Sequence, residues 1–241
     1  DPPLEIGRVS QLPKMPDHLD PSSPTWDDPA WKDVPAFRLP RNEPYPRSPR
    51  YPTDVKWMRD GGTLALLVRV NEPEPVVADR GGRDADLSGD DHLRLYLATS
   101  GSRFLEIMID STGAIRDSIG GGLHTLRRPS PAWNSGIKVQ TRIENRAWIA
   151  RINILLQECA EALGETKIPS QWRMLLARYR APRPGEPAEV SALPPIGSET
   201  FYGPLRYRRV TLSAKGPSQV VTPILESKPA AGLAGELSAL N

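Results

Sequence analysis

The stretch TDVKWMRDGGTLALLVRV, residues 53–70, contains two strand-like runs on either side of a tight turn. Asp54–Arg59 and Thr63–Val70 are rich in aliphatic and aromatic residues, whereas Asp60-Gly61-Gly62 between them is typical of a β-turn. Strands joined by so short a connection pair side by side and antiparallel. The segment therefore predicts a β-hairpin, and with it an antiparallel sheet as the base of the fold.

Alternating runs of the same kind continue along the chain. In His92–Ala98 leucine occupies every second position, so one face of the strand is apolar and the other polar. Leu155–Leu163 fits a short helix that ends at Gly164. Regular short strands with one helix predict an all-β fold, an antiparallel β-sandwich of the jelly-roll or immunoglobulin-like kind. The remaining predicted strands are Phe104–Asp110, 114–118, Ile137–Ile143, Ala147–Asn153, Gln171–Tyr179 and Leu205–Leu212.

The two ends of the chain lack this pattern. Prolines at positions 2, 3, 13, 16, 21 and 24 forbid a continuous helix or a central strand in residues 1–24, which are expected to form an extended proline-rich arm. Residues 213–241 combine small residues and prolines without strand periodicity, and they are predicted to form an irregular tail. The β-sandwich domain is thus expected to cover residues 25–212.

Composition excludes several classes of protein. With 31 Lys and Arg against 29 Asp and Glu, the formal net charge of +2 lacks the positive excess of nucleic-acid-binding proteins. Cys159 is the single cysteine, and His18, His92 and His124 lie far apart, so the chain has neither an internal disulfide nor a zinc-binding motif. No apolar run approaches the ~20 residues that span a bilayer. Because the chain begins at Asp1, we expect an exported protein, periplasmic or secreted, whose signal peptide has been removed.

A series of local patterns occurs in a fixed order between residues 25 and 212. They are Asp27-Asp28-Pro29-Ala30-Trp31, Thr53–Val70, Gly89–Leu97, Phe104–Gly113, Trp148–Ile154, Trp172–Arg178 and Phe201–Leu205. In content and order these patterns resemble the family 9 carbohydrate-binding modules. The resemblance implies a β-sandwich whose usual ligand is a carbohydrate and which has no catalytic activity of its own.

In the sugar-binding members of that family, two tryptophans enclose a sugar ring, helped by a glutamate, an arginine and an asparagine. Aromatic faces match the apolar faces of sugar rings, and charged groups bind the hydroxyls. The resemblance places the first tryptophan near Leu87 or Ser88, the second near Ile196, the glutamate at Arg94 and the arginine at Met108. The chain departs from the family at each of these positions, so recognition of a sugar by the family's own residues is not expected.

Several residues remain as candidate ligand contacts. Trp133 follows the flexible stretch Gly120-Gly121-Gly122, and it either offers an aromatic binding platform or anchors its loop on the core. Tyr202 could complete such a platform. Arg178 matches an arginine at the end of a family strand, and it could face a ligand or pair with a carboxylate.

Asp84, Asp86, Asp90 and Asp91 gather in one acidic loop. Calcium prefers carboxylate oxygens, so Asp84, Asp86 and Asp90 form a candidate calcium site, and Asp91 is a further candidate ligand contact. The spacing of an EF-hand is missing, and acidic loops are often solvated surface, so both interpretations stay open. No other cofactor is expected.

Motifs of known catalytic sites are missing, including the Gly-x-Ser-x-Gly elbow and the phosphate-binding P-loop. We therefore predict a non-catalytic, extracytoplasmic binding or docking module, with carbohydrate as the ligand that the family implies. One alternative is an accessory subunit of a larger envelope or membrane-associated complex, which would dock through its terminal arms. A second is a haem-binding subunit of an oxidoreductase, because some such subunits have a related sandwich; its axial ligands would come from Met58, Met108 or Met174 with Lys56 or His92.

Overall fold

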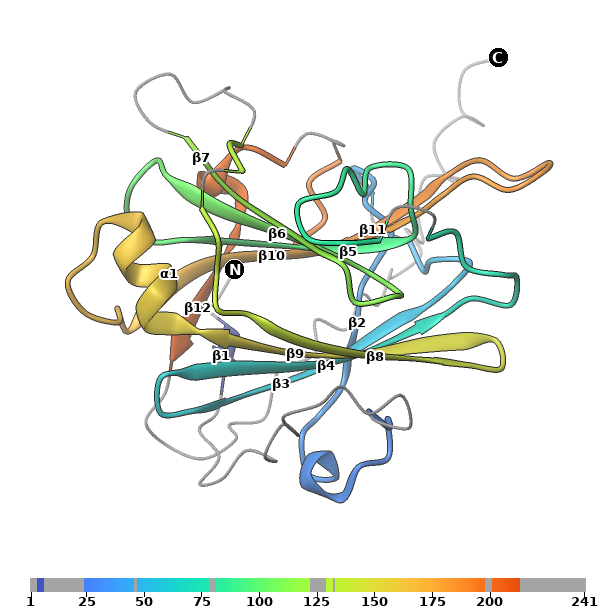
Figure 1. Ribbon diagram of the computed structural model, residues 1–241, viewed down its shortest axis with the longest axis horizontal. Coiled ribbons are helices and arrows are strands. Elements are labelled where there is room, and N and C mark those ends of the chain that lie inside the picture. Colours follow the sequence, from blue (N-terminus) through green and yellow to red (C-terminus); the bar gives the residue numbers. More distant parts are fainter. Residues whose placement is uncertain are drawn as a thin grey trace, which may run out of the picture.

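Two β-sheets stacked face to face form the body of the molecule (Figure 1). The computed structural model describes residues 4–6, 24–45, 47–78, 81–121, 129–131, 133–197 and 201–212. The five-stranded sheet has the order β2-β3-β4-β9-β8, with β2 Phe37–Arg38, β3 Thr53–Asp60, β4 Thr63–Asn71, β8 Lys138–Glu144 and β9 Ala147–Leu155. Its neighbouring strands are antiparallel throughout. The predicted hairpin of residues 53–70 is confirmed as β3 and β4.

The seven-stranded sheet has the order β1-β12-β10-β5-β6-β7, and β11 also pairs with β10. Its strands are β1 Leu4–Ile6, β5 His92–Ala98, β6 Phe104–Asp110, β7 Ile115–Gly120, β10 Gln171–Arg180, β11 Glu189–Leu193 and β12 Arg208–Leu212. All pairs are antiparallel except that of β1 with β12, which is parallel. The predicted antiparallel β-sandwich is therefore confirmed.

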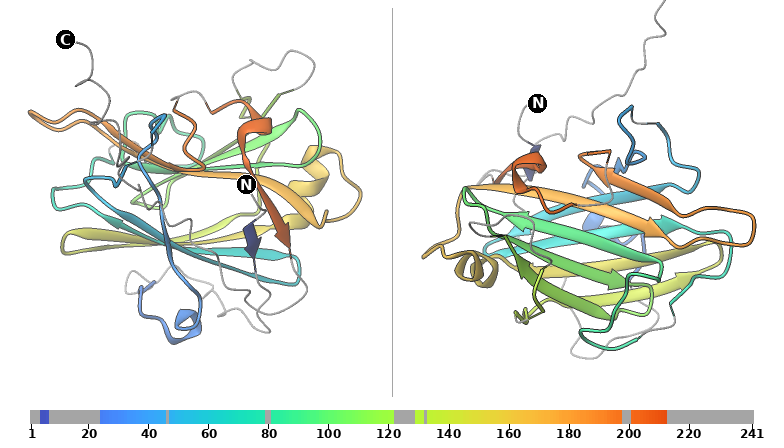
Figure 2. Two further views of the ribbon diagram at one scale, coloured as in Figure 1. Left: turned by 180° about the vertical axis from the view of Figure 1, so that it is seen from behind. Right: turned by 90° about the horizontal axis from the view of Figure 1, so that it is seen from above.

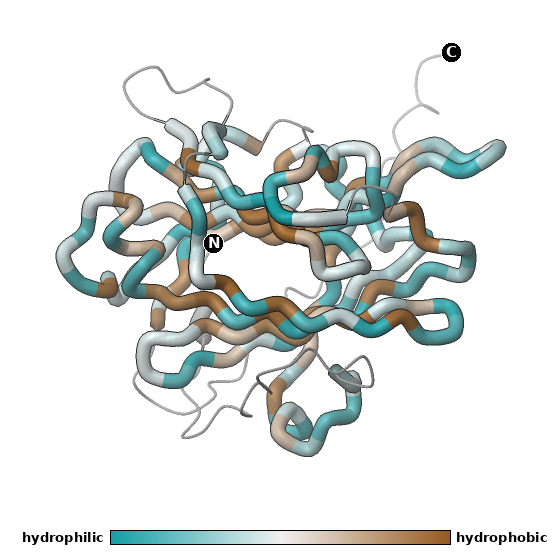
Figure 3. Tube along the Cα trace, viewed as in Figure 1, coloured by the Kyte–Doolittle hydropathy of each residue, from teal (hydrophilic) through white to brown (hydrophobic). Residues whose placement is uncertain are grey.

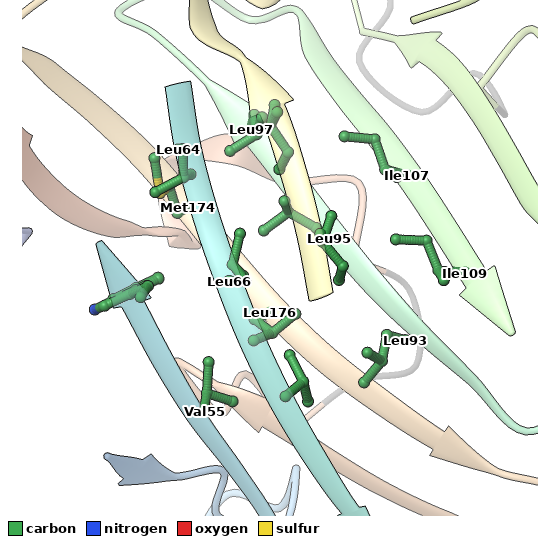
Figure 4. Packing of buried hydrophobic residues seen from close by; sticks show 14 of the residues in the cluster. Val55, Leu64, Leu66, Leu93, Leu95, Leu97, Ile107, Ile109, Met174 and Leu176 are labelled. Carbon is green, nitrogen blue, oxygen red and sulfur yellow. The ribbon is translucent and has the colours of Figure 1, made fainter. Parts of the chain in front are cut away.

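The main core lies between the two sheets. Alternation sends Leu93, Leu95 and Leu97 of β5 inward, where they meet Leu64 and Leu66 of β4 across the gap (Figure 4). All five side chains are at most 2% exposed. Because each sheet contributes every second residue, the core is a continuous apolar layer, as expected for a sandwich.

Both sheets also carry apolar clusters on their outer faces. Beneath the five-stranded sheet, the segment that contains the short 3-10 helix η1 (Pro29–Trp31) packs Trp31 and Val34 against residues of β3, β4 and β9. Above the seven-stranded sheet, Phe201 and Tyr207 pack against Tyr96 of β5. The hydropathy colouring shows apolar stretches along both sheets and in these covering segments (Figure 3).

The predicted helix is α1, Leu156–Leu163, which closes one end of the sandwich (Figure 1). Gly164 ends it in the left-handed region with a φ of 93°, a conformation that favours glycine. Leu156, Cys159 and Leu163 are buried in the main core. Within the described ranges, no helix is long and apolar enough to cross a membrane.

The structure refines the predicted ends of the chain. The predicted strand Leu205–Leu212 begins instead as the 3-10 helix η2 (Pro204–Arg206), because Pro204 fixes the first helical position. In the arm, Leu4–Ile6 forms β1 and extends the sheet along β12. An edge is the place where a proline-rich segment can join a sheet. The predicted tail, 213–241, lies outside the described residues.

Candidate functional site

The candidate site is a concavity on the outer face of the seven-stranded sheet. Its volume is about 210 Å³, and we call it the outer-face pocket. It lies where β5, β10 and β11 run side by side; Figure 2 (right) looks down on this sheet, with β10 between β5 and β11. The pocket is lined by Ser88, Arg94, Ala177, Arg178, Tyr179, Val190 and Phe201.

Strand alternation directs the side chains of Arg94 and Tyr179 outward. Arg94 on β5 lies opposite Ala177 on β10, and residues directly opposite on antiparallel strands share a face. Leu93 and Leu95, on either side of Arg94, face the main core. Tyr179 follows Ala177 by two positions, so it also faces outward. The small side chain of Ala177 leaves room between the larger groups around it.

His92 lies buried beside the pocket and connects two of its side chains. Its ring stacks on that of Tyr179, with 5.1 Å between the centroids and 23° between the planes. Its Nε2 lies 2.7 Å from the Nε of Arg94, and its Nδ1 lies 2.7 Å from the carbonyl oxygen of Asp90. A neutral ring protonated on Nδ1 satisfies both contacts, since arginine can only donate and a carbonyl can only accept. Burial, together with the charge of Arg94, lowers the pKa of His92 to about 3.

Arg94 gives the pocket its positive charge. Among the described residues, no Asp or Glu forms an ion pair with it, and its side chain is only half-buried. The ring of Tyr179 is also half-buried, so one face of the pocket is aromatic. A cation beside an aromatic ring suits a ligand with an apolar face and a rim of hydroxyl or anionic groups.

Arg178, predicted to face a ligand or a carboxylate, is engaged by a carboxylate. Its Nη2 donates to Glu72 Oε2 over 2.8 Å, and its Nη1 donates to the Tyr51 carbonyl over 2.9 Å. The Nε of Arg180 donates to the same Glu72 oxygen over 2.8 Å, and Arg183 lies 3.8 Å from it. We call Glu72 and these three arginines the Glu72 cluster. It is buried at the end of the sandwich, and burial lowers the pKa of Arg178.

The two predicted aromatic contacts lie on different faces of the sheet. Trp133 is half-buried and packs against the main core between the sheets. Tyr202 packs on the outer face, where its ring stacks on Phe104 at 5.8 Å with 13° between the planes. The structure therefore does not bring Trp133 and Tyr202 together as one platform, and neither lines the outer-face pocket.

The acidic loop is arranged by contacts within the protein. Asp91 is buried, accepts hydrogen bonds from the backbone N–H groups of Val77 and Ala181, and pairs with Arg183. Asp86 is exposed and lies 3.5 Å from Arg116. Within the described part of the chain, no three His, Cys, Asp or Glu side chains are gathered so that they could hold a metal ion. The calcium site predicted at Asp84, Asp86 and Asp90 thus stays a prediction without geometric support.

The side chains named as haem ligands are likewise dispersed. Met58, Met108 and Met174 belong to three separate hydrophobic clusters. The ammonium of Lys56 donates to the Trp31 carbonyl over 3.1 Å, and both ring nitrogens of His92 have partners. The haem alternative therefore gains no support from their placement.

The sequence predicted none of Ser88, Arg94 and Tyr179 as a ligand contact. Ser88 and Arg94 stand at positions that the family resemblance assigned to sugar contacts, and both line the pocket. The sequence places Tyr179 in a strand and gives no further sign of a binding role. Trp172, Met174 and Leu176 are apolar and face the core, so the odd-numbered residues of the same strand, Tyr179 among them, face outward.

Comparisons with known proteins give matches of structure alone. No protein-family model matches the sequence, and no curated protein matches it. A candidate carbohydrate-binding protein from Bacteroides uniformis superposes with a TM-score of 0.63 at 14% identity, covering 87% of this chain and 98% of that one. A family 9 carbohydrate-binding module from Caldicellulosiruptor kristjanssonii, solved with glucose, gives 0.57 at 14% identity, covering 91% and 99%. The same organism's module solved with cellotriose gives 0.56 at 14% identity, covering 89% and 95%. The chain therefore has the fold of the family 9 carbohydrate-binding modules, as its sequence patterns had indicated.

Proposed function

We propose that this chain is a non-catalytic, extracytoplasmic carbohydrate-binding module and that a sugar ring binds in the outer-face pocket. The observation that carries the proposal is the convergence of Arg94, Ser88 and the half-exposed ring of Tyr179 on one concavity. Arg94 and Ser88 occupy positions that the family resemblance assigned to sugar contacts. The fold shared with proteins solved with glucose and cellotriose supports the same conclusion.

The pocket offers the two kinds of contact that sugars need. The ring of Tyr179 can stack on the apolar face of a pyranose, and the guanidinium of Arg94 can donate hydrogen bonds to its hydroxyls. His92 holds both groups in place before a ligand arrives, which lowers the entropy that binding costs. At about 210 Å³ the pocket is smaller than the ~300–1,000 Å³ typical of drug-sized ligands. A single ring, with the rest of the chain outside, fits this volume.

Removing either contact should weaken binding while the fold persists. We expect Tyr179→Ala to lower the affinity for neutral oligosaccharides about tenfold, because aromatic stacking contributes about 0.5–1.5 kcal/mol beyond the buried area. Arg94→Ala should have a similar or larger effect, since hydrogen bonds to charged groups contribute about 1.5–3 kcal/mol. Isothermal titration calorimetry against glucose, cello-oligosaccharides and other soluble glycans measures both effects.

Matched variants separate the pocket from the rest of the surface. Tyr45 is 87% exposed and does not line the pocket, and the side chain of Arg47 is 73% exposed. Tyr45→Ala and Arg47→Ala should therefore leave affinity unchanged. Thermal denaturation confirms that each variant is folded. The proposal is wrong if the wild-type chain binds no glycan, or if Tyr179→Ala and Arg94→Ala bind as well as the two control variants.

The docking alternative rests on the terminal arms. Of these, Leu4–Ile6 lies along the chain's own sheet, and the other arm residues are outside the described ranges apart from Pro24. No specific contact favours docking over glycan binding, so a role as an accessory subunit stays a prediction.

A further inference from the structure

Many arginines of this chain are neutralised by carboxylates. Arg38, for example, lies 2.7 Å from Asp54, and the arginines of the Glu72 cluster share several acids. The arginines that gather at one place on the surface are not neutralised in this way, because none of them forms an ion pair with an Asp or Glu within the described ranges: Arg173, Arg206, Arg208 and Arg209. Like charges brought together without a counter-charge repel one another. Their gathering therefore points to a missing anion.

All four line one concavity of about 400 Å³, which we call the arginine pocket. Pro194, Leu205 and Tyr207 complete its lining, and no acidic residue belongs to it. Arg173 and Arg209 lie directly opposite each other on β10 and β12, so their side chains share a face of the sheet. The positive charge is thus concentrated at one place on the molecule.

The guanidinium groups are partly held in position. Arg173 Nη1 donates to the Leu205 carbonyl over 3.4 Å, and Arg206 Nη2 donates to the Ile196 carbonyl. Arg208 lies opposite Met174 of the main core, so its side chain starts from the other face of β12, and its buried Nε has no hydrogen-bond partner among the described residues. A buried charged donor without a partner is unfavourable. A bound oxyanion in the pocket would supply the opposite charge to Arg173, Arg206 and Arg209.

The topology explains why a hollow forms here. One edge of β10 is shared by two strands, since β12 pairs with Gln171–Met174 and β11 pairs with Leu176–Arg180. The chain leaves β11 at Pro194 and returns through η2 to β12. The arginine pocket lies at this junction, and Leu205 and Arg206 of η2 belong to its lining.

We propose that the arginine pocket binds the anionic group of an acidic glycan, a sulfate ester or a uronic-acid carboxylate. The inference rests on the proposed function, because it extends the glycan beyond the outer-face pocket. Arg173 and Tyr179 share the outer face of β10 six positions apart, or about 20 Å along the strand. Phe201 and Tyr207 cover Leu175 and Ala177 between these two positions, and an extended oligosaccharide that passes over them can place a ring on Tyr179 and a charged substituent among the arginines. Planar guanidinium groups suit such oxyanions, since they donate paired hydrogen bonds to them.

The test compares charged and neutral forms of the same polymer. Dextran sulfate and dextran differ in sulfate alone, and polygalacturonate supplies the carboxylate. We expect the wild-type chain to bind at least one acidic polymer about tenfold or more tightly than neutral dextran, and the difference to shrink with added salt as exposed charges are screened. Affinity gel electrophoresis and calorimetry measure this preference.

Charge reversal locates the site. Arg206 and Arg209 are exposed, and Arg206→Glu/Arg209→Glu should remove the preference for acidic polymers. The control Arg47→Glu/Lys138→Glu changes the net charge equally at exposed positions outside both pockets, and it should keep the preference. Thermal denaturation shows whether each double variant is folded.

The outcomes distinguish this inference from the proposed function. The acidic-glycan site would be overturned if both double variants lost the preference for acidic polymers equally, or if the wild type showed no such preference. Binding of neutral glycans through Tyr179 would still stand in either case. Binding of double-stranded DNA as tightly as the acidic polymers would overturn the acidic-glycan site too, because it indicates a general attraction to polyanions. Loss of the preference for acidic polymers in the Arg206→Glu/Arg209→Glu variant alone supports the acidic-glycan site. The measurements with dextran sulfate and with polygalacturonate then show which anionic group is recognised. Failure to bind any glycan contradicts the proposed function itself.

Discussion

Replacing Glu72 with Gln is expected to lower the free energy of unfolding by about 3–5 kcal/mol, the range seen when one partner of a buried ion pair is removed. The Glu72 side chain is fully buried, and those of Arg178 and Arg180 are 1% exposed. Glu72 accepts hydrogen bonds from both arginines, at 2.8 Å from Arg178 Nη2 and at 2.8 and 3.2 Å from Arg180. Gln keeps the volume but removes the charge, so two buried cations lose their shared counter-charge.

The neighbouring Glu74 provides a matched control. Its side chain is 42% exposed, and it lies 3.7 Å from Arg180 and 3.8 Å from Arg183. Exposed ion pairs contribute about 0–1 kcal/mol, so Glu74→Gln should change the unfolding free energy by less than about 1 kcal/mol. Urea denaturation at pH 7 measures both variants. Equal changes in unfolding free energy for Glu72→Gln and Glu74→Gln would mean that burial does not set the strength of these ion pairs.

The Glu72 cluster also supports the candidate site. Arg180 further contacts Glu186 over 3.0 Å, and Glu189 accepts hydrogen bonds from the backbone N–H groups of Arg50 and Tyr51. The Glu186 contact holds the connection between β10 and β11, and the Glu189 contacts join the start of β11 to residues 50–51; β11 carries Val190 of the outer-face pocket. Loss of the cluster is therefore expected to disturb ligand binding as well as stability.

The strand pattern of the sequence predicted the sandwich because alternation is a local property. Leucine at every second position of His92–Ala98 leaves one register in which the apolar side chains are buried. The same reasoning predicted the hairpin of residues 53–70, whose turn residues fix the pairing. In both cases the information lies within a few neighbouring residues.

The features of the site that the sequence did not predict depend on contacts between segments far apart in the sequence. Alternation places Arg178 of β10 on the inner face of the seven-stranded sheet and His92 of β5 on its outer face. It cannot show that Arg178 meets Glu72 or that His92 stacks on Tyr179. The family resemblance treated Arg94 and Ser88 as positions where sugar contacts are missing, so it predicted neither of them as a ligand contact. Tyr179 lies at a different position from either of the family's tryptophans, so a motif comparison had no place for it.

Acidification provides a second strong test, through His92. Its pKa is lowered to about 3 in the folded chain, whereas an unfolded histidine titrates near 6.5. The unfolded state therefore binds one more proton than the folded state between these values, and stability falls as pH decreases through this window. Integrated from pH 7 to pH 4, this one ring should remove about 3 kcal/mol from the unfolding free energy.

Carboxylates also contribute to acid unfolding, so the effect of His92 must be isolated by substitution. His92→Gln loses the stacking on Tyr179 and is expected to be less stable at pH 7, yet its stability should fall by about 3 kcal/mol less than that of the wild type between pH 7 and pH 4. Parallel urea denaturation series at both pH values give the difference directly. An identical pH dependence for the two proteins would contradict a buried neutral ring.

The same protonation state predicts how the outer-face pocket responds to acid. Nε2 of His92 can accept from Arg94 only while the ring is neutral, and the lowered pKa keeps it neutral in the folded chain well below pH 6.5. The geometry of Arg94 and Tyr179 should therefore persist to about pH 4, and the ring of His92 should show no titration by NMR above that pH. Affinity for a neutral glycan is expected to stay constant from pH 7 to pH 4 while stability declines. A parallel fall of affinity in this range would place a protonating histidine in the site and contradict the geometry on which the binding proposal rests.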